Sequence, residues 1–150
     1  MAISMRRSIL FSLTVIIMAI IIGGCCPCRK TQRLVQPLVG TKWQLVQLMA
    51  KDVVAEGDSY TLTFHDNATI SGMGDCNHIT ATYLTNSKRE LRIENIGTTR
   101  RYSPNYEQEN AFLDMLESVT HYEMDATLML LLSNGTLVGI MEAQLPDAAN

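Results

Sequence analysis

What this sequence lacks narrows the functions open to it. The 150-residue chain has no excess of positive charge, since 12 Lys and Arg stand against 15 Asp and Glu. Proteins that bind nucleic acids neutralise phosphates with a basic face, so this balance argues against that class. The chain also lacks internal repeats and low-complexity tracts, and its length suits one domain of ordinary size. A multidomain machine is therefore excluded.

The sequence also lacks a hydrophobic run long enough for a permanent membrane span. Residues 9–22 are apolar except for Ser12 and Thr14, and they follow Arg6 and Arg7. As a helix this run reaches about 21 Å at ~1.5 Å per residue, short of the roughly 30 Å hydrocarbon core. We therefore predict a signal peptide over residues 1–24. An uncleaved signal anchor is the alternative, because tilt and flanking residues can extend a short span. Removal of residues 1–24 leaves 10 basic and 15 acidic residues, a net charge of −5.

The end of the apolar run resembles a bacterial lipobox, Ile22-Gly23-Gly24-Cys25. In signals of this kind the cysteine thiol receives a diacylglyceryl group and the chain is cut before it. We therefore expect a lipid anchor at Cys25, stabilised by about 0.8 kcal/mol for each buried CH₂ group; ordinary cleavage is the alternative. Residue 26 is Cys rather than Asp, so the inner-membrane retention signal of enteric lipoproteins is absent. The acidic surface-export signal of some other lipoproteins is also absent. The expected location is the outer membrane, facing the periplasm.

Two more cysteines, Cys26 and Cys28, lie beside the expected anchor. Cys25 and Cys28 have the CxxC spacing of redox and metal sites. A lipidated Cys25 is a thioether, however, and no strand-to-helix pattern surrounds the motif. We expect Cys26 and Cys28 to be further acylation sites, to form adventitious disulfides or to have no role. Residues 25–37 then form a lipidated tether.

From residue 38 onward the hydrophobic pattern mostly has a period of two, which is typical of half-buried strands. Strands are predicted over residues 41–49, 60–64, 69–73, 78–84, 91–96, 127–132 and 136–141. Asn134-Gly135 between the last two favours a type I′ hairpin. One helix interrupts the strands, with Asn105 as its N-cap and Gln108 completing a capping box.

The predicted helix has an apolar stripe and a polar side. The stripe, expected to pack on the sheet, consists of Phe112, Met115, Leu116 and Val119. The solvent side is expected to contain Glu109, Asp114 and Glu117. The predicted fold class is α+β: one small domain over residues 38–145, with a curved, partly barrel-like antiparallel sheet and one helix packed across it.

The most distinctive segment is residues 69–79, Thr-Ile-Ser-Gly-Met-Gly-Asp-Cys-Asn-His-Ile. With Gly40-Thr41-Lys42-Trp43 upstream, it resembles the META/HslJ domain family, which has a Gly-Thr-x-Trp strand and a Gly-Cys-Asn element. The family's Thr-Arg segment is matched within residues 96–101, and its Glu-x-x-Phe helix within residues 109–113. The resemblance spans residues 38–142. The family-motif residues, to which we assign structural roles, are Trp43, Gly72, Gly74, Asp75, Cys76, Asn77, Thr99 and Arg100.

The resemblance implies a small exported lipoprotein linked to stress response or secretion, with no established reaction. One position departs from the family pattern: Ser103 stands where members often carry a second cysteine. In members with both cysteines, the residue matching Cys76 can form a disulfide at that position. Cys76 is then a free thiol within its domain, and loss of the staple typically costs about 2–4 kcal/mol.

The glycine-rich segment is open to two interpretations. The structural one is a β-bulge or tight bend in which Asn77 bonds backbone groups. The chemical one is a thiol-dependent enzyme or redox sensor that uses Cys76 and His78, because residues i and i+2 of an extended strand share a face. A third hypothesis is a small-ligand binder in the mouth of the sheet.

We expect neither a catalytic nor a cofactor site, and no metal site. A metal site formed with His65, Asp66 or His121 is conceivable, but the histidines lack ligand spacing. The expected partners are the membrane, through Cys25, and an unidentified envelope protein. A small basic area is expected from Lys88, Arg89, Arg92, Arg100 and Arg101. Such an area is usually a solvated face, and near a membrane it can contact anionic headgroups or lipopolysaccharide.

Overall fold

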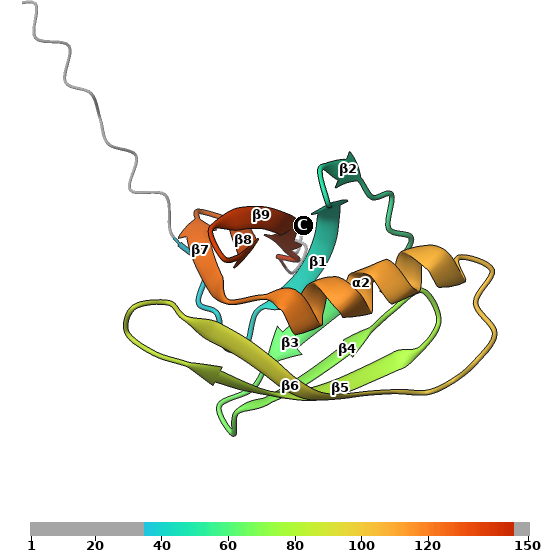
Figure 1. Cartoon of the computed structure of the whole chain (residues 1–150), viewed down its shortest axis with the longest axis horizontal. Helices are drawn as coiled ribbons and strands as arrows, with labels where there is room; N and C mark the ends of the chain where they lie inside the picture. Colours follow the sequence, from blue (N-terminus) through green and yellow to red (C-terminus); the bar gives the residue numbers. More distant parts are fainter. Residues whose placement is uncertain (1–34, 146–150) are drawn as a thin grey trace, which may run out of the picture. The chain divides into compact units, whose positions relative to one another are not determined.

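The structure is a computed structural model that describes residues 35–145. The predicted signal peptide, the lipidation site Cys25 and the tether up to residue 34 lie outside the described residues. Within residues 35–145 there are nine strands and one helix (Figure 1). In chain order these are β1 (Lys42–Leu48), β2 (Lys51–Asp52), β3 (Thr61–Phe64), β4 (Thr69–Met73), β5 (His78–Thr85), β6 (Leu91–Thr98), α2 (Tyr106–Ser118), β7 (His121–Asp125), β8 (Leu128–Ser133) and β9 (Thr136–Ala143).

All nine strands belong to one antiparallel sheet with the order β6-β5-β4-β3-β1-β9-β8-β7, and the short β2 pairs with β1. Strands β3 to β6 form one meander and β7 to β9 another, and the β1–β9 pairing joins the two. The two edge strands are β6 and β7, and a single isolated bridge connects Glu90, the residue before β6, with His121 of β7; we call this contact the seam. The sheet is therefore not closed, and the partly barrel-like shape expected from the sequence is not confirmed.

Helix α2 runs across the sheet, as predicted (Figure 1). Its stripe is buried, and Phe112 meets the ring of Tyr60 edge-on with the ring centroids 5.6 Å apart. Two details of the helix prediction are wrong. Asn105 is the N-cap residue but makes no side-chain cap hydrogen bond, so there is no capping box. Glu109 is only 5% exposed rather than solvent-facing, because it lies three residues before Phe112 and shares its helix face.

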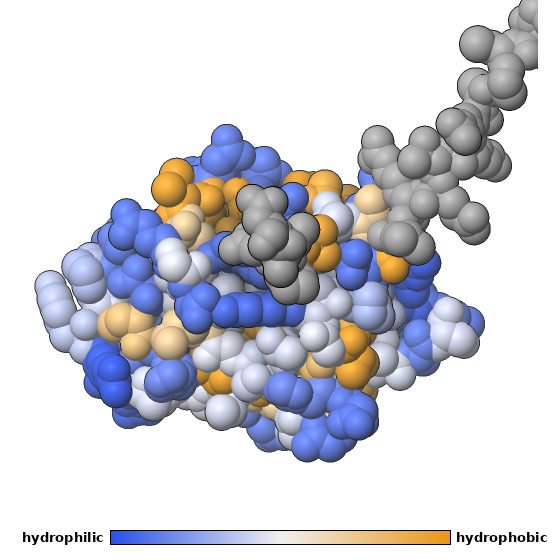
Figure 2. All heavy atoms as spheres, turned by 180° about the vertical axis from the view of Figure 1, so that it is seen from behind, coloured by the Kyte–Doolittle hydropathy of each residue, from blue (hydrophilic) through white to orange (hydrophobic). Residues whose placement is uncertain are grey.

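The core lies between α2 and the sheet. Its fully buried side chains include Trp43, Leu45, Leu62, Phe64, Phe112, Met115, Met129 and Leu131. Trp43 and Phe64 are fully buried in this core, and the small-ligand hypothesis stays a prediction. In the part of the chain that the structure describes, no helix combines the length and the hydrophobicity needed to cross a membrane. Figure 2 shows the face opposite to that of Figure 1, where hydrophilic side chains predominate and hydrophobic ones lie in separate patches.

The predicted strands are present, with boundaries within two residues of those expected. Asn134 and Gly135 both have positive φ, +48° and +83°, as a type I′ hairpin requires. Two strands were not expected: the two-residue β2 and the edge strand β7.

Candidate functional site

Most of the family-motif residues meet at the point where the β4–β5 connection, residues 99–105 and the start of α2 come together. Residues 75–77 form a tight bend between β4 and β5, in which the Gly74 N–H donates to the Asn77 carbonyl at 2.7 Å. We call Asp75, Asn77, Thr99, Ser103 and Glu109 the motif cluster. Its members come from three separate segments, and hydrogen bonds between side chains join those segments.

Asn77 is the centre of the motif cluster and is only 5% exposed. Its Nδ2 donates to Glu109 Oε2 at 2.9 Å and to the Arg101 carbonyl at 3.2 Å. Its Oδ1 accepts from the Arg101 N–H at 2.7 Å and from Thr99 Oγ1 at 3.2 Å. One side chain thereby satisfies groups on the helix and on the 99–105 segment, so its amide is fully used in holding the fold.

Glu109 projects from the first turns of α2 into the bend. Its Oε2 accepts from Asn77, whereas the buried Oε1 has no hydrogen-bond partner among the described residues. A Cβ atom added at Gly74 would overlap this carboxylate. Gly74 is therefore required for the close approach of the helix side chain to the bend.

Asp75 accepts three hydrogen bonds through its carboxylate. The donors are Ser103 Oγ at 2.7 Å, Asn105 Nδ2 at 3.1 Å and the Tyr60 hydroxyl at 3.4 Å. The bonds from Ser103 and Asn105 hold the pKa of Asp75 below its ordinary value. Burial, followed by the nearby charge of Asp75, raises the pKa of the Tyr60 hydroxyl above its ordinary value. Ser103 stands at the family's second cysteine position, and its bond to Asp75 connects the 99–105 segment with the 75–77 bend without a disulfide.

Cys76 is a half-buried free thiol. Its Sγ donates to the Tyr102 carbonyl at 3.5 Å and accepts from Asn77 Nδ2 at 3.9 Å. Because residue 76 lies in the bend and not in an extended strand, the i, i+2 argument for a pair with His78 does not apply. His78 opens β5 with an exposed side chain, and its backbone N–H donates to Thr99 Oγ1 at 3.0 Å.

The other family-motif residues lie outside the motif cluster. Trp43 is fully buried in β1, and its indole N–H donates to the Leu38 carbonyl at 3.2 Å. Gly72 lies in β4, where a Cβ atom would overlap the backbone oxygen of Thr61 on β3. Arg100 is exposed and makes no hydrogen bond or ion pair within residues 35–145.

The histidines weighed as metal ligands do not come together with other ligands. His65 Nε2 lies 2.7 Å from Ser71 Oγ, and His121 lies at the seam. Across residues 35–145, no three His, Cys, Asp or Glu side chains are placed to hold a metal ion.

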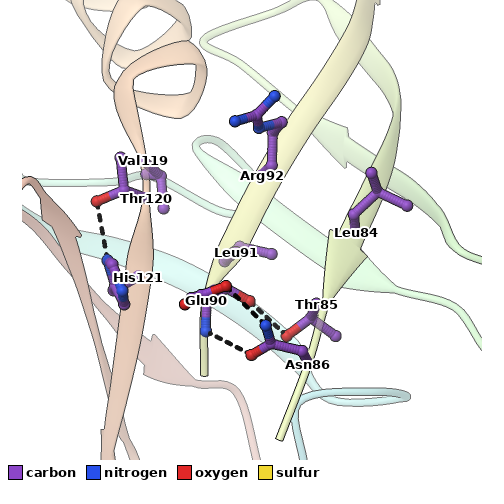
Figure 3. A pocket seen from close by; sticks show the side chains of 9 residues that line it. All are labelled: Leu84, Thr85, Asn86, Glu90, Leu91, Arg92, Val119, Thr120 and His121. Carbon is purple, nitrogen blue, oxygen red and sulfur yellow. Dashed lines mark hydrogen bonds between the residues drawn. The ribbon is translucent and has the colours of Figure 1, made fainter. Parts of the chain in front are cut away.

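Three surface hollows adjoin the motif cluster or the seam. One, of about 570 Å³, adjoins the motif cluster and is lined by acidic and polar side chains that include Asp52, Glu56, Tyr60 and Asp75. The other two, of about 370 Å³ each, lie beside the seam, and His121 lines both. Figure 3 shows the hollow on the helix side of the seam, between Val119–His121 and the β5–β6 hairpin. There the Glu90 carboxylate accepts from Asn86 Nδ2 at 2.7 Å.

Sequence reasoning missed the roles of Glu109, Asn105 and Tyr60 in this region. The position of Glu109 on the apolar stripe was a usable signal, because an acidic residue at a stripe position is buried and needs a partner. Nothing in the sequence indicated that Tyr60 and Asn105 reach the same carboxylate.

The geometry defines a small α+β domain built on one antiparallel sheet, with its motif residues engaged in holding loops together. The family model for the META domain matches residues 36–144. The chain belongs to the META domain family, as the resemblance predicted.

Solved structures share this fold. A DUF4847 family protein from Bacteroides vulgatus is 18% identical with a TM-score of 0.54, and the match covers 71% of this chain and 93% of that one. A protein from Burkholderia xenovorans is 21% identical with a TM-score of 0.56, over 73% of this chain and 85% of that one. A third structure, solved by NMR, is 19% identical with a TM-score of 0.55, over 68% and 87%. No curated protein matches the chain.

Proposed function

We propose that this chain is a lipid-anchored, non-catalytic META domain protein of the bacterial cell envelope, held at the outer membrane and facing the periplasm. It binds an envelope partner in stress response or secretion. The observation that carries the proposal is the lipobox-like sequence Ile22-Gly23-Gly24-Cys25 directly after the apolar run. The two or three acyl chains of a lipoprotein cysteine give a stable anchor.

Two observations on the domain support a non-catalytic role. The polar side chains of the motif cluster hydrogen-bond to one another and to the backbone, and within the described residues only Glu109 Oε1 is left without a partner. The one free thiol within residues 35–145 bonds to the Tyr102 carbonyl and not to an imidazole base. A base within hydrogen-bond reach of the sulfur is one of the usual ways in which a nucleophilic cysteine is activated, and Cys76 has no such base among the described residues.

Metabolic labelling with radioactive palmitate tests the anchor. The full chain is expected to incorporate the label and to fractionate with the outer membrane, and Cys25→Ala is expected to lose both properties. Cys26→Ala is the matched control, since it leaves the lipobox intact, and any fall in its label measures the acylation of Cys26 itself. Label that persists in Cys25→Ala, or that never enters the wild-type chain, contradicts the proposal.

Replacement of the Cys76 thiol tests the catalytic alternative. Crosslinking in intact cells followed by mass spectrometry identifies the envelope partners of the wild-type chain. We expect Cys76→Ser to recover the same partners and to leave the strain's stress tolerance unchanged. Loss of that tolerance in a Cys76→Ser chain that still folds and is still lipidated favours thiol chemistry instead.

A further inference from the structure

The β5–β6 turn carries two cations that the fold does not use. Lys88 and Arg89 are exposed, and neither makes an ion pair within the described part of the chain. The ion pairs found there involve Lys42 with Asp58 and Arg92 with Glu94. Arg100 and Arg101 form a second adjacent pair without an ion pair in the described residues, but only Lys88 and Arg89 line a surface hollow.

The backbone that carries these cations is held in place from both sides. Asn86 Oδ1 accepts from the Lys88 N–H at 2.9 Å and from the Glu90 N–H at 3.3 Å. The Arg89 N–H donates to the Asn86 carbonyl, and the Arg89 carbonyl accepts from the Tyr122 N–H of β7, both at 3.0 Å. A fixed backbone lowers the entropy cost of binding at the side chains it presents.

The hollow on the β7 side of the seam lies against this turn. It measures about 370 Å³, and its lining includes Lys88, Arg89, His121, Tyr122 and Glu123. An ammonium, a guanidinium, an imidazole and a phenol are all able to donate hydrogen bonds, and only Glu123 contributes a negative charge. Arg and Lys are side chains that commonly bind phosphate oxygens in proteins.

We propose that this hollow binds a phosphate group supplied by an anionic lipid headgroup. The proposal rests on the proposed function, in which Cys25 holds the domain at a bilayer. The chain enters the fold at Gln36, whose N–H donates to the Ala126 carbonyl just after β7 at 3.0 Å. The hollow lies at the other end of that five-residue strand, about 17 Å away at ~3.4 Å per residue. Residues 26–35 span at most about 35 Å, so an anchored domain can place the hollow at the headgroups.

The reactivity of Lys88 tests the proposal. The full-length lipidated chain is reconstituted in vesicles of phosphatidylcholine alone, and in vesicles of phosphatidylcholine and phosphatidylglycerol in equal parts. The rate at which an amine reagent acylates each lysine is followed by mass spectrometry. We expect Lys88 to react about tenfold more slowly in the anionic vesicles, with Lys51 on β2 as the unprotected internal control. A third arm adds inorganic phosphate to the phosphatidylcholine vesicles.

Charge variants separate a defined site from general attraction. Arg89→Gln is expected to abolish the protection of Lys88. The double change Arg100→Gln and Arg101→Gln is the matched control: it removes two adjacent exposed cations outside the hollow and is expected to leave the protection intact. Glu123→Gln, on the exposed side of an edge strand, is expected to increase the protection, because it removes the one repulsive carboxylate of the hollow.

Each outcome decides the proposal. Protection of Lys88 by phosphatidylglycerol, with or without protection by inorganic phosphate, supports it. Protection by inorganic phosphate alone, equal protection of Lys51, loss of protection in the Arg100 and Arg101 control, or no protection overturns it. The mass of the modified Cys25 peptide in the same preparation reports anchoring separately. Unprotected Lys88 in a lipidated chain therefore refutes the site and leaves the proposed function standing.

Discussion

The motif cluster and the turn beside the seam use their polar side chains in opposite ways. In the motif cluster, Asp75 and Asn77 bond to groups of the chain itself, and the cluster ties α2 to two loops. At the β5–β6 turn, hydrogen bonds fix the backbone and leave the charged ends of Lys88 and Arg89 without partners in the described residues.

This difference teaches that the most distinctive sequence of the chain has a structural role. We call the motif cluster, together with the segments that it connects, the joint. A glycine-rich segment with Asp, Cys and Asn has the composition of a reactive loop, yet here its polar atoms are occupied internally. Groups that are already satisfied gain little from a ligand, since binding only exchanges one hydrogen bond for another. The exposed cations of the β5–β6 turn can exchange water for a ligand without breaking a bond of the fold, and nothing in their sequence is distinctive.

The largest expected effect comes from removing the centre of the joint. Asn77→Ala leaves the buried Glu109 carboxylate and two backbone groups of Arg101 without their partner, and we expect a loss of about 4 kcal/mol in the free energy of unfolding. Lys88→Gln, at the turn, is expected to change it by less than about 0.5 kcal/mol. Urea denaturation measures both. Equal effects of the two substitutions would contradict the view that the motif cluster stabilises the fold and the cations of the β5–β6 turn do not.

A cysteine introduced at position 103 tests how close the 99–105 segment lies to Cys76 in the 75–77 bend. Cys76 Sγ is 3.5 Å from the carbonyl of Tyr102, the residue before Ser103. We expect Ser103→Cys to form a disulfide with Cys76, and the oxidised form to be about 3 kcal/mol more stable than the reduced form. Peptide mapping identifies the bond, and denaturation with and without reductant measures the gain. Ser103→Ala is the control that loses the bond to Asp75 without adding sulfur. A Cys76 that stays free under oxidising conditions speaks against the expected pairing.

Two glycine substitutions sharpen the comparison further. A Cβ at Gly74 overlaps the buried Glu109 carboxylate, whereas a Cβ at Gly97 on β6 lies 3.2 Å from the Thr80 hydroxyl, which can move. We expect Gly74→Ala to cost about 2 kcal/mol and Gly97→Ala to cost less than about 1 kcal/mol. Thermal unfolding of the two variants in parallel provides the test. A Gly74→Ala variant as stable as Gly97→Ala would show that Glu109 can leave the bend freely.

Much of the fold could be predicted because its signals are local. Alternation with a period of two marks β3 and β4, and Asn134-Gly135 marks the last hairpin, since both depend only on neighbouring residues. Strand β7 was missed although Tyr122 and Met124 alternate with polar residues. Its polar positions carry His and acidic residues, as suits an edge strand, and these residues have low strand propensity.

The joint and the seam could not be predicted because both depend on contacts between distant segments. Asn77 and Glu109 are 32 positions apart, and Glu90 and His121 meet only because the two ends of the sheet approach each other. The sequence does place Asn105 at a helix start, where its side chain is expected to cap the helix. The side chain bonds to Asp75 instead, because the bend brings an ionised carboxylate within 3.1 Å and hydrogen bonds to charged groups are the stronger ones.

The smallest expected effect concerns pH. Hydrogen bonds from Ser103 and Asn105 keep the pKa of Asp75 lower in the folded chain than the value of about 3.9 in an unfolded one. The stability that Asp75 contributes is therefore fully present above about pH 4, and it is lost as the pH falls through the folded-state pKa. Asp75→Asn cannot titrate, so the difference in unfolding free energy between the wild-type chain and this variant should be constant from pH 7 to 5 and shrink below pH 4. Denaturation midpoints measured across that range provide the test, with Lys88→Gln as a pH-independent reference. If the difference instead grows on acidification, the carboxylate is held in its protonated form, and the joint is built around a neutral acid.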